Sequence, residues 1–478
     1  MNLPPSFITR TSQLMGEDAC SELCEALQHD TPVSVRINKN KCNKEVENSR
    51  NIPWASDGYY LADRPTFTFD PLFHTGSYYV QEAASMFVES AVCKYIKTPV
   101  VMLDLCAAPG GKSTLLRSFL PEGSILVANE VMRNRSQILA ENIIKWGHPD
   151  VMVTNNDPAD FTSLGPLFDA ILTDVPCSGE GMFRKDEVAV EEWSPANVGL
   201  CWERQRRILR DIWPCLKSGG ILIYSTCTFN REENEDNVAW IAKELGAEVL
   251  PVDVKDEWNI TGNLTGGDFP VYRFLPHKTE GEGLFLAVLR KNGSTDDCDE
   301  DIFSDNKSKK NKKSSKSKND KGQRPVSFPK ELKDWISTDD EMEYIVDGSN
   351  ACALSKKLNA IETIMKSNIH NLNILHRGIT LGEMKGKDWQ PHHSLAMSII
   401  LNNETFPKAE LSYEQAIAYL RKEAVVLDSS VPKGYVLVTY SDVPLGFVKN
   451  IGNRANNLYP QEWRIRSGYL PEEIKMVF

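Results

Sequence analysis

The segment Val100–Thr114, with the sequence VVMLDLCAAPGGKST, constrains the fold more than any other part of the chain. An apolar run from Val100 to Leu105, interrupted only by Asp104, is typical of a strand that is buried on both faces. Two glycines follow, and a helix-like segment begins after them. Such glycines let backbone N–H groups approach a ligand, and a helix N-terminus favours negative charge. The segment therefore predicts half of a nucleotide-binding unit, although it is not GxGxxG and a plain tight turn is the alternative.

Strand-like and helix-like segments alternate from this unit to residue 291, which predicts a doubly wound α/β sheet. Strands are expected at residues 100–105, 124–129, 151–155, 168–173, 220–226 and 284–289, and helices at 114–120, 133–146, 202–216 and 230–245. The strand at 284–289 is interpreted as the antiparallel edge of the sheet.

The chain of 478 residues is long enough for two to four domains. A first domain is expected over residues 1–99, with helices at 18–27 and 78–91 and a strand at 32–39. The α/β domain covers 100–291. Residues 292–325 are acidic and then lysine-rich with few apolar side chains, so we expect a disordered linker. Its lysines could bind RNA phosphates, or the segment could be a solvated tether.

Globular sequence resumes after the linker, as an intermediate domain over residues 326–400 and a last domain over 401–478. Helices are expected at 355–366 and 413–423, and a hairpin at 435–440 and 445–449. Residues 453–460, NRANNLYP, combine arginine, asparagine and tyrosine on a predicted loop. That mixture suits single-stranded RNA recognition and equally an asparagine-rich turn. Arg36 and Lys39, in the first domain, could contact RNA or form a solvated strand edge.

The net charge of −12 gives no general nucleic-acid footprint, so any RNA contact must use local basic surface. Eleven cysteines in so long a chain do not indicate a disulfide scaffold. No signal peptide and no membrane-spanning run is found, so a cytoplasmic protein with reduced thiols and no membrane partner is expected. No metal site is predicted, because the adjacent His392 and His393 point apart and lack further ligands.

Two predicted strands end at a cysteine, in Asp174-Val175-Pro176-Cys177 and in Ser225-Thr226-Cys227. The carboxyl ends of parallel strands line the ligand crevice, so both thiols should face the same pocket as the glycine turn. A thiolate without a histidine partner argues against a protease and fits attack on a pyrimidine ring. Addition at carbon 6 makes carbon 5 nucleophilic, and a base must later remove the carbon-5 proton. These residues alone do not decide which thiol attacks.

Glu130 ends the second strand, about twenty positions beyond the glycine turn. A carboxylate at this place can accept hydrogen bonds from ribose hydroxyls. The alternative is a carboxylate that only stabilises the N-terminus of the following helix.

Three motifs together resemble the NOL1/NOP2/Sun family of RNA 5-methylcytosine methyltransferases. They are Cys106–Lys112 (CAAPGGK), Asp174–Gly179 (DVPCSG) and Ser225–Thr228 (STCT), the last followed by Glu232-Glu233-Asn234. The chain is most similar to the RsmF-type branch, which methylates small-subunit ribosomal RNA. Leu445–Pro460 and the C-terminal extension resemble its PUA-like RNA-binding region. Val175 stands where the family usually has alanine, which adds bulk without removing a functional group.

The resemblance implies a Rossmann-like fold and S-adenosyl-L-methionine as cofactor. It implies that the cofactor contacts the turn residues, namely Cys106, Ala107, Ala108, Pro109, Gly110, Gly111 and Lys112. Glu130 would hold the ribose, Asp157 would lie by the adenine, and Asp174 would lie between the methionine end and the target base. Cys227 would be the nucleophile and Cys177 would assist product release. DNA cytosine methyltransferases, as a class, attack with the Pro-Cys thiol instead.

The implied partner is RNA, ribosomal RNA ahead of transfer RNA, with the small ribosomal subunit as a possible assembled target and a monomeric enzyme. One alternative is a methyltransferase acting on nitrogen, but such enzymes typically carry an Asn/Asp-Pro-Pro-Tyr/Phe tetrad where this chain has Cys177. Another is a catalytically idle RNA-binding assembly factor. The presence of both thiols and of Asp174 argues against it.

Overall fold

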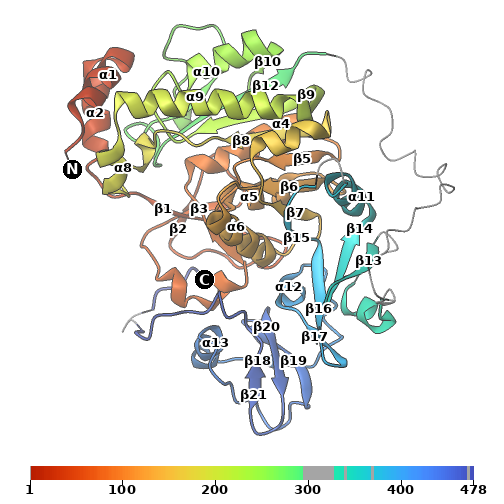
Figure 1. Cartoon of the computed structure of the whole chain (residues 1–478). Coiled ribbons are helices and arrows are strands. Elements are labelled where there is room, and N and C mark those ends of the chain that lie inside the picture. The colour runs from red at the N-terminus through yellow and green to blue at the C-terminus, as the bar shows by residue number, and fades with distance from the viewer. Residues whose placement is uncertain (1, 294–327, 338–341, 368–370, 471–473) are drawn as a thin grey trace, which may run out of the picture.

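The computed structural model describes residues 2–293, 328–337, 342–367, 371–470 and 474–478 (Figure 1). The predicted lysine-rich linker lies outside the described residues, apart from its first two positions. Among the described residues, no helix is both long and apolar enough to cross a membrane.

Nine strands of the described chain form the central sheet, in the order β10-β12-β9-β8-β5-β6-β7-β15, with β11 paired to β12. The parallel strands are β5 (Val101–Asp104), β6 (Ile125–Asn129), β7 (Val151–Thr154), β8 (Phe168–Asp174) and β9 (Leu216–Thr226). Antiparallel pairs add β10 (Ala247–Leu250), β11 (Tyr272–Phe274), β12 (Leu284–Lys291) and β15 (Ile374–Arg377). The predicted doubly wound α/β class is therefore confirmed.

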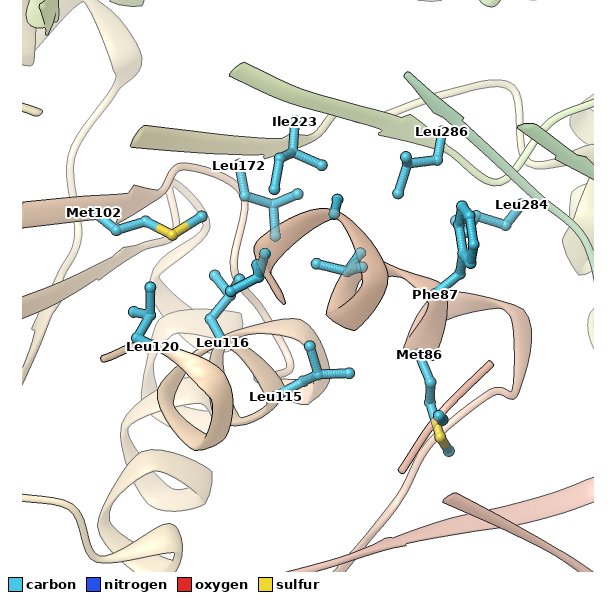
Figure 2. Close-up of a cluster of buried hydrophobic side chains, with 14 of the residues drawn as sticks. Met86, Phe87, Met102, Leu115, Leu116, Leu120, Leu172, Ile223, Leu284 and Leu286 are labelled. Atoms are coloured by element: carbon cyan, nitrogen blue, oxygen red, sulfur yellow. The ribbon is translucent and has the colours of Figure 1, made fainter. Parts of the chain in front are cut away.

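Helices cover both faces of this sheet, because successive strand residues point to opposite sides. One face packs against α4 (Val88–Tyr95), α5 (Gly111–Phe119) and α6 (Arg133–Trp146). The other packs against α7 (Pro158–Phe161), α9 (Pro195–Ile212), α10 (Glu235–Trp240) and α11 (Lys356–Met365). Figure 2 shows Leu115 and Leu116 of α5 in the first core with Met102 of β5. Burying each such side chain contributes about 1.5–3 kcal/mol to folding.

The prediction that the strand at 284–289 forms the edge of the sheet is wrong. This strand, β12, lies between β9 and β10, so β10 forms the edge. The apolar run 284–289 is buried throughout, as expected for a strand with neighbours on both sides.

Three predicted helices have different bounds. The helix expected at 202–216 begins at Pro195, because Ser194 Oγ accepts a hydrogen bond from Asn197 N and proline suits the first helical position. The helix expected at 230–245 begins only at Glu235, since the preceding residues form a polar turn. In the helix expected at 78–91, Tyr78–Val80 is instead strand β4, and α4 begins at Val88. Aromatic and β-branched residues favour the strand.

The N-terminal region combines two helices, α1 (Pro5–Met15) and α2 (Glu17–Ala26), with a small sheet in the order β2-β3-β1-β4. Its strands are β1 (Val33–Ile37), β2 (Ser49–Asn51), β3 (Gly58–Leu61) and β4 (Tyr78–Val80), and α3 (Pro71–His74) precedes β4. The suggested RNA contact at Arg36 is wrong. Arg36 is fully buried, its Nε donates to Gln81 Oε1 over 2.8 Å, and its guanidinium lies 4.4 Å from the Trp146 ring centroid.

The C-terminal region contains two four-stranded sheets. The first consists of β13 (Met342–Asp347), β14 (Asn350–Ser355), β16 (Ile379–Lys385) and β17 (Asp388–Pro391), followed by α12 (His393–Met397). The second consists of β18 (Lys408–Glu410), β19 (Gly434–Tyr440), β20 (Val443–Asn450) and β21 (Ala455–Asn457), with α13 (Tyr413–Leu420). The predicted hairpin is confirmed as β19–β20. Its turn is at Ser441 and Asp442, which have φ of 51° and 65°, the left-handed pair that suits a tight hairpin.

The described residues between 342 and 400 do not form a separate core, because two of their elements pack onto the central sheet. Strand β15 extends the central sheet beside β7, and α11 buries Leu358, Ile361 and Met365 against the second face of that sheet. This part of the C-terminal region therefore completes the core of the α/β domain (Figure 1).

Candidate active site

The turn between β5 and α5 is held from outside by α6. Asn142 Nδ2 donates to Pro109 O over 2.8 Å, and an Arg135 guanidinium nitrogen donates to Ala108 O over 2.8 Å. Gly110 has φ of 117° and occupies the N-cap of α5, where no side chain caps the helix. A side chain is strained at this φ, which favours glycine. The first N–H groups of α5 therefore have no side-chain cap, an arrangement that suits a bound ligand.

Carboxyl groups from three neighbouring strands surround this turn. Asp104 is fully buried, its Oδ2 accepts from Ser113 Oγ over 2.6 Å, and its Oδ1 has no partner among the described residues. Burial raises the pKa of Asp104 to about 7. Glu130 is 3% exposed, and its Oε1 accepts from Met132 N over 2.8 Å. This contact is the one expected of a carboxylate at a helix start.

Asp157 is half-buried and already has a structural role. Its side chain accepts a hydrogen bond from Ala159 N over 3.1 Å and takes part in a capping box with Asp160 at the start of α7. An Arg207 guanidinium nitrogen lies 3.7 Å from Asp157 Oδ1. Capping and the ion pair with Arg207 account for these contacts without a ligand.

The two cysteines at the ends of β8 and β9 lie side by side, with 3.1 Å between Cys177 Sγ and Cys227 Sγ. Asp174, three residues before Cys177, joins the same site. Its Oδ2 lies 2.8 Å from Lys112 Nζ, and its Oδ1 accepts from Ser225 Oγ over 2.7 Å. The structure thus brings the two thiols together at the carboxyl ends of the strands, as the sequence predicted, and adds an ion pair between Asp174 and Lys112 of the glycine turn that was not predicted.

The surroundings set the charges of these groups. The hydrogen bond with Cys227 and burial together raise the pKa of Cys177 well above that of a free thiol, so this thiol keeps its proton at neutral pH. Burial lowers the pKa of Lys112, but the Asp174 carboxylate more than offsets this, and the pKa lies above its ordinary value. Lys112 therefore stays cationic beside the thiols.

Buried polar residues lie behind the thiols, where no role was predicted for them. Glu233 and Asn230 are buried, and they bond to each other and to the loop that carries Cys177. The signal was present in the run Glu232-Glu233-Asn234, which is separated from STCT by three residues. Three polar side chains so close to a strand end are expected to be partnered when buried.

The RNA-binding loop predicted at 453–460 is wrong in part, because Ala455–Asn457 is strand β21, paired with β20. Tyr459 is fully buried, and its ring packs edge-to-face with those of Tyr419 and His393. Asn457 Nδ2 donates to Tyr419 O over 2.8 Å and so terminates α13. Neither side chain is available to stack on or read a base, whereas Arg454 and Asn456 are exposed.

The residues at the turn fit a cationic nucleoside cofactor. S-adenosylmethionine carries positive charge on its sulfonium and ammonium groups, and Asp104, Glu130 and Asp174 supply carboxyl groups around the turn. The unpartnered Asp104 Oδ1 is the feature that a bound cation would satisfy.

Three family models match consecutive parts of the chain. Residues 96–290 match the 16S rRNA methyltransferase RsmB/F model, residues 3–83 match the N-terminal domain of 16S rRNA methyltransferase RsmF, and residues 406–465 match the methyltransferase RsmF PUA domain.

Individual proteins of the same family are similar to this chain over nearly its whole length. It is 30% identical to ribosomal RNA small subunit methyltransferase F of Aliivibrio salmonicida over 485 residues, covering 98% of both chains. It is also 30% identical to the protein of that name from Aliivibrio fischeri, again covering 98% of both. The solved structure of a methyltransferase homolog protein from Pyrococcus horikoshii is 28% identical, with a TM-score of 0.51, and covers 60% of this chain and 100% of that one.

Fold and site define an S-adenosylmethionine-dependent RNA methyltransferase, as the turn, the carboxyl groups and the matching families agree. Within that class, the chain belongs to the RsmF family.

Proposed function

We propose that this enzyme methylates carbon 5 of a cytosine in 16S ribosomal RNA through a covalent cysteine–cytosine intermediate. The observation that carries the proposal is the pair of thiols 3.1 Å apart at the strand ends, beside the Lys112–Asp174 ion pair. Methyl transfer to nitrogen or to a ribose oxygen needs no thiol, whereas a cytosine carbon must first be activated by addition to the ring.

The family resemblance assigns attack to Cys227 and product release to Cys177, and the contact between the two sulfur atoms supports roles for both in one reaction. The Cys227 sulfur bonds to carbon 6 while the 5,6 double bond opens and its electron pair moves to carbon 5. The bound S-adenosylmethionine supplies the methyl group that carbon 5 then takes. Loss of the carbon-5 proton to a base returns the electron pair to the 5,6 bond and expels Cys227. Cys177, at hydrogen-bond distance from Cys227, would assist this release.

Roles for the remaining site residues belong to the same proposal. Cys106–Lys112 would contact the cofactor, Glu130 its ribose and Asp157 its adenine. Asp174 would lie at the methionine end and near the target base, and its pairing with Lys112 supports that position.

We further propose that RNA is bound by the N-terminal region 1–99 and by residues 326–478, with 401–478 as the PUA-like part. The match at 406–465 supports this assignment. The division at 99, 291, 325 and 400 remains a proposal about units of function, since α11 packs onto the central sheet. A cytoplasmic monomer is proposed, and the ten cysteines within the described ranges, all free thiols, are consistent with a reducing compartment.

The test is methylation in vitro of naked 16S ribosomal RNA and of small subunits, with isotopically labelled S-adenosylmethionine. Mass spectrometry of the digested RNA should place the label in 5-methylcytidine. Label in another nucleoside would contradict the proposal. Bisulfite sequencing of RNA from cells lacking the gene would then identify the cytosine.

A further inference from the structure

A buried carboxylate links the two loops that carry the thiols. Glu233 is fully buried, and its Oε2 accepts from Ser178 N, next to Cys177, over 3.0 Å. Its Oε1 accepts from Asn230 Nδ2 over 2.7 Å, on the loop that follows Cys227. A single side chain thus bonds to both cysteine loops.

Further hydrogen bonds fix the carboxylate itself. Gln205 Nε2, on α9, donates to Glu233 Oε2 over 2.6 Å and to Pro176 O over 3.0 Å. The Tyr224 hydroxyl, on β9, donates to Glu233 O over 2.6 Å. Because α9 and β9 are regular elements packed in the second core, they hold Glu233 in one place relative to both loops.

We propose that Glu233 is a positioning residue that sets the separation of Cys177 and Cys227. Burial raises the pKa of Glu233, and the hydrogen bonds from Ser178 and Asn230 act in the opposite direction because they favour the ionised form. Hydrogen bonds to the ionised carboxylate are shorter and stronger than those to a neutral acceptor.

Without the carboxylate, the Ser178 N–H loses its acceptor in a buried site. The two loops keep neutral hydrogen bonds such as that between Ser178 Oγ and Thr228 Oγ1, over 3.0 Å, but lose their charged acceptor, so the Cys177 loop is expected to shift. The position of Cys177 decides whether it reaches Cys227, so Glu233 acts through the thiols and does not contact the base.

A direct measure of thiol separation is the rate at which the pair closes to a disulfide. Oxidised glutathione exchanges with one thiol, the second thiol displaces the bound glutathione, and the products are the Cys177–Cys227 disulfide and two reduced glutathione molecules. Peptide mapping by mass spectrometry follows this bond separately from the other cysteines. This readout does not require methyl transfer or RNA.

The variant is Glu233→Gln, whose amide has the same volume as the carboxylate but only one acceptor oxygen. At least one of the donors Ser178 N, Gln205 Nε2 and Asn230 Nδ2 then meets an N–H instead of an acceptor. Closure should slow at least about tenfold.

The matched control is Glu89→Gln, on α4. That buried carboxylate likewise accepts a backbone N–H, from Ser56 over 3.0 Å, but touches neither cysteine loop. It should lower the unfolding temperature and leave the closure rate unchanged.

Closure of Glu233→Gln at the rate of the unaltered protein would overturn the proposal. So would equal slowing in the control variant, since this would reveal a general loss of stability. If Glu233→Gln does not fold, Glu233→Asp keeps the charge but shortens the reach, and it should also slow closure.

A second readout depends on the proposed function. If Cys177 assists release, Glu233→Gln should accumulate the covalent RNA adduct, whereas Glu89→Gln should not. Slowed disulfide closure without any adduct in the Cys177→Ala variant would support the positioning role of Glu233 and contradict the proposed chemistry, so the two failures can be told apart.

Discussion

The sequence predicted a functional role both for the two cysteines at the carboxyl ends of β8 and β9 and for the segment 453–460. The structure supports the first prediction more fully than the second. At the sheet edge, Cys177 and Cys227 lie where the strands end, 3.1 Å apart. In the loop, Tyr459 is buried and its hydroxyl lies 3.4 Å from His74 Nδ1, in a segment 385 residues earlier. Strand ends are placed by a local apolar pattern, whereas the exposure of an isolated aromatic residue depends on partners that the local sequence does not contain.

The largest expected effect is on stability, and it tests whether the buried Tyr459 has a structural role. Tyr459→Ala removes a ring that packs against Tyr419 and His393, so it should lower the free energy of unfolding by about 3–5 kcal/mol. Thermal and urea unfolding measure this loss. The matched variant is Arg454→Ala, an exposed side chain in the same loop. It should change stability by less than about 0.5 kcal/mol while weakening RNA binding. A stable Tyr459→Ala protein that has only lost RNA affinity would restore the original interpretation of the loop.

The next effect concerns the buried carboxyl group at the cofactor turn. The pKa of Asp104 is about 7 in the folded protein, above its ordinary value, so the folded state keeps a proton that the unfolded state releases. Stability of the cofactor-free protein should therefore fall as pH rises from about 4 to about 7. Asp104→Asn removes this loss, so it should stabilise the protein at pH 8, by about 4 kcal/mol at most, and little at pH 4. An equal shift in unfolding temperature at both pH values would contradict the assignment.

A smaller effect separates Glu130 and Asp157, two of the acidic residues assigned to the cofactor. Glu130→Ala should weaken S-adenosylmethionine binding by about 1–3 kcal/mol, the usual effect of losing hydrogen bonds to a charged group. Asp157→Ala gives the comparison, because capping of α7 already accounts for its contacts. Calorimetry with both folded variants measures the difference. Unchanged affinity in Glu130→Ala would leave that residue as a helix-start carboxylate only.

Much of the fold was predictable because the parallel strands are continuous apolar runs, and β5 to β9 were found within a few residues. The glycine turn and the two cysteines could be placed for the same reason. Arg36 could not, since an arginine in an alternating strand resembles a solvated edge until its partners Gln81 and Trp146 are known. The pairing of β15 with β7 could not be predicted either, because the sequence of a short strand does not indicate which distant strand it pairs with.

Glu233 shows a further limit. Its run of polar residues was visible beside the nucleophile motif, but burial comes from α9 and β9, and only the folded chain brings Gln205 to the carboxylate. The sequence was enough to predict that both thiols lie at the carboxyl ends of the strands. The distance between them depends on tertiary packing.

The central claim is that Cys227 attacks the base and Cys177 acts after methyl transfer. The most direct measurement is a denaturing gel of labelled RNA incubated with S-adenosylmethionine and either Cys227→Ala or Cys177→Ala. Cys227→Ala should give neither methylation nor adduct, while Cys177→Ala should methylate, release poorly and accumulate a slowly migrating protein–RNA band. A band from Cys227→Ala with none from Cys177→Ala would contradict the account and assign the attack to the Pro-Cys thiol.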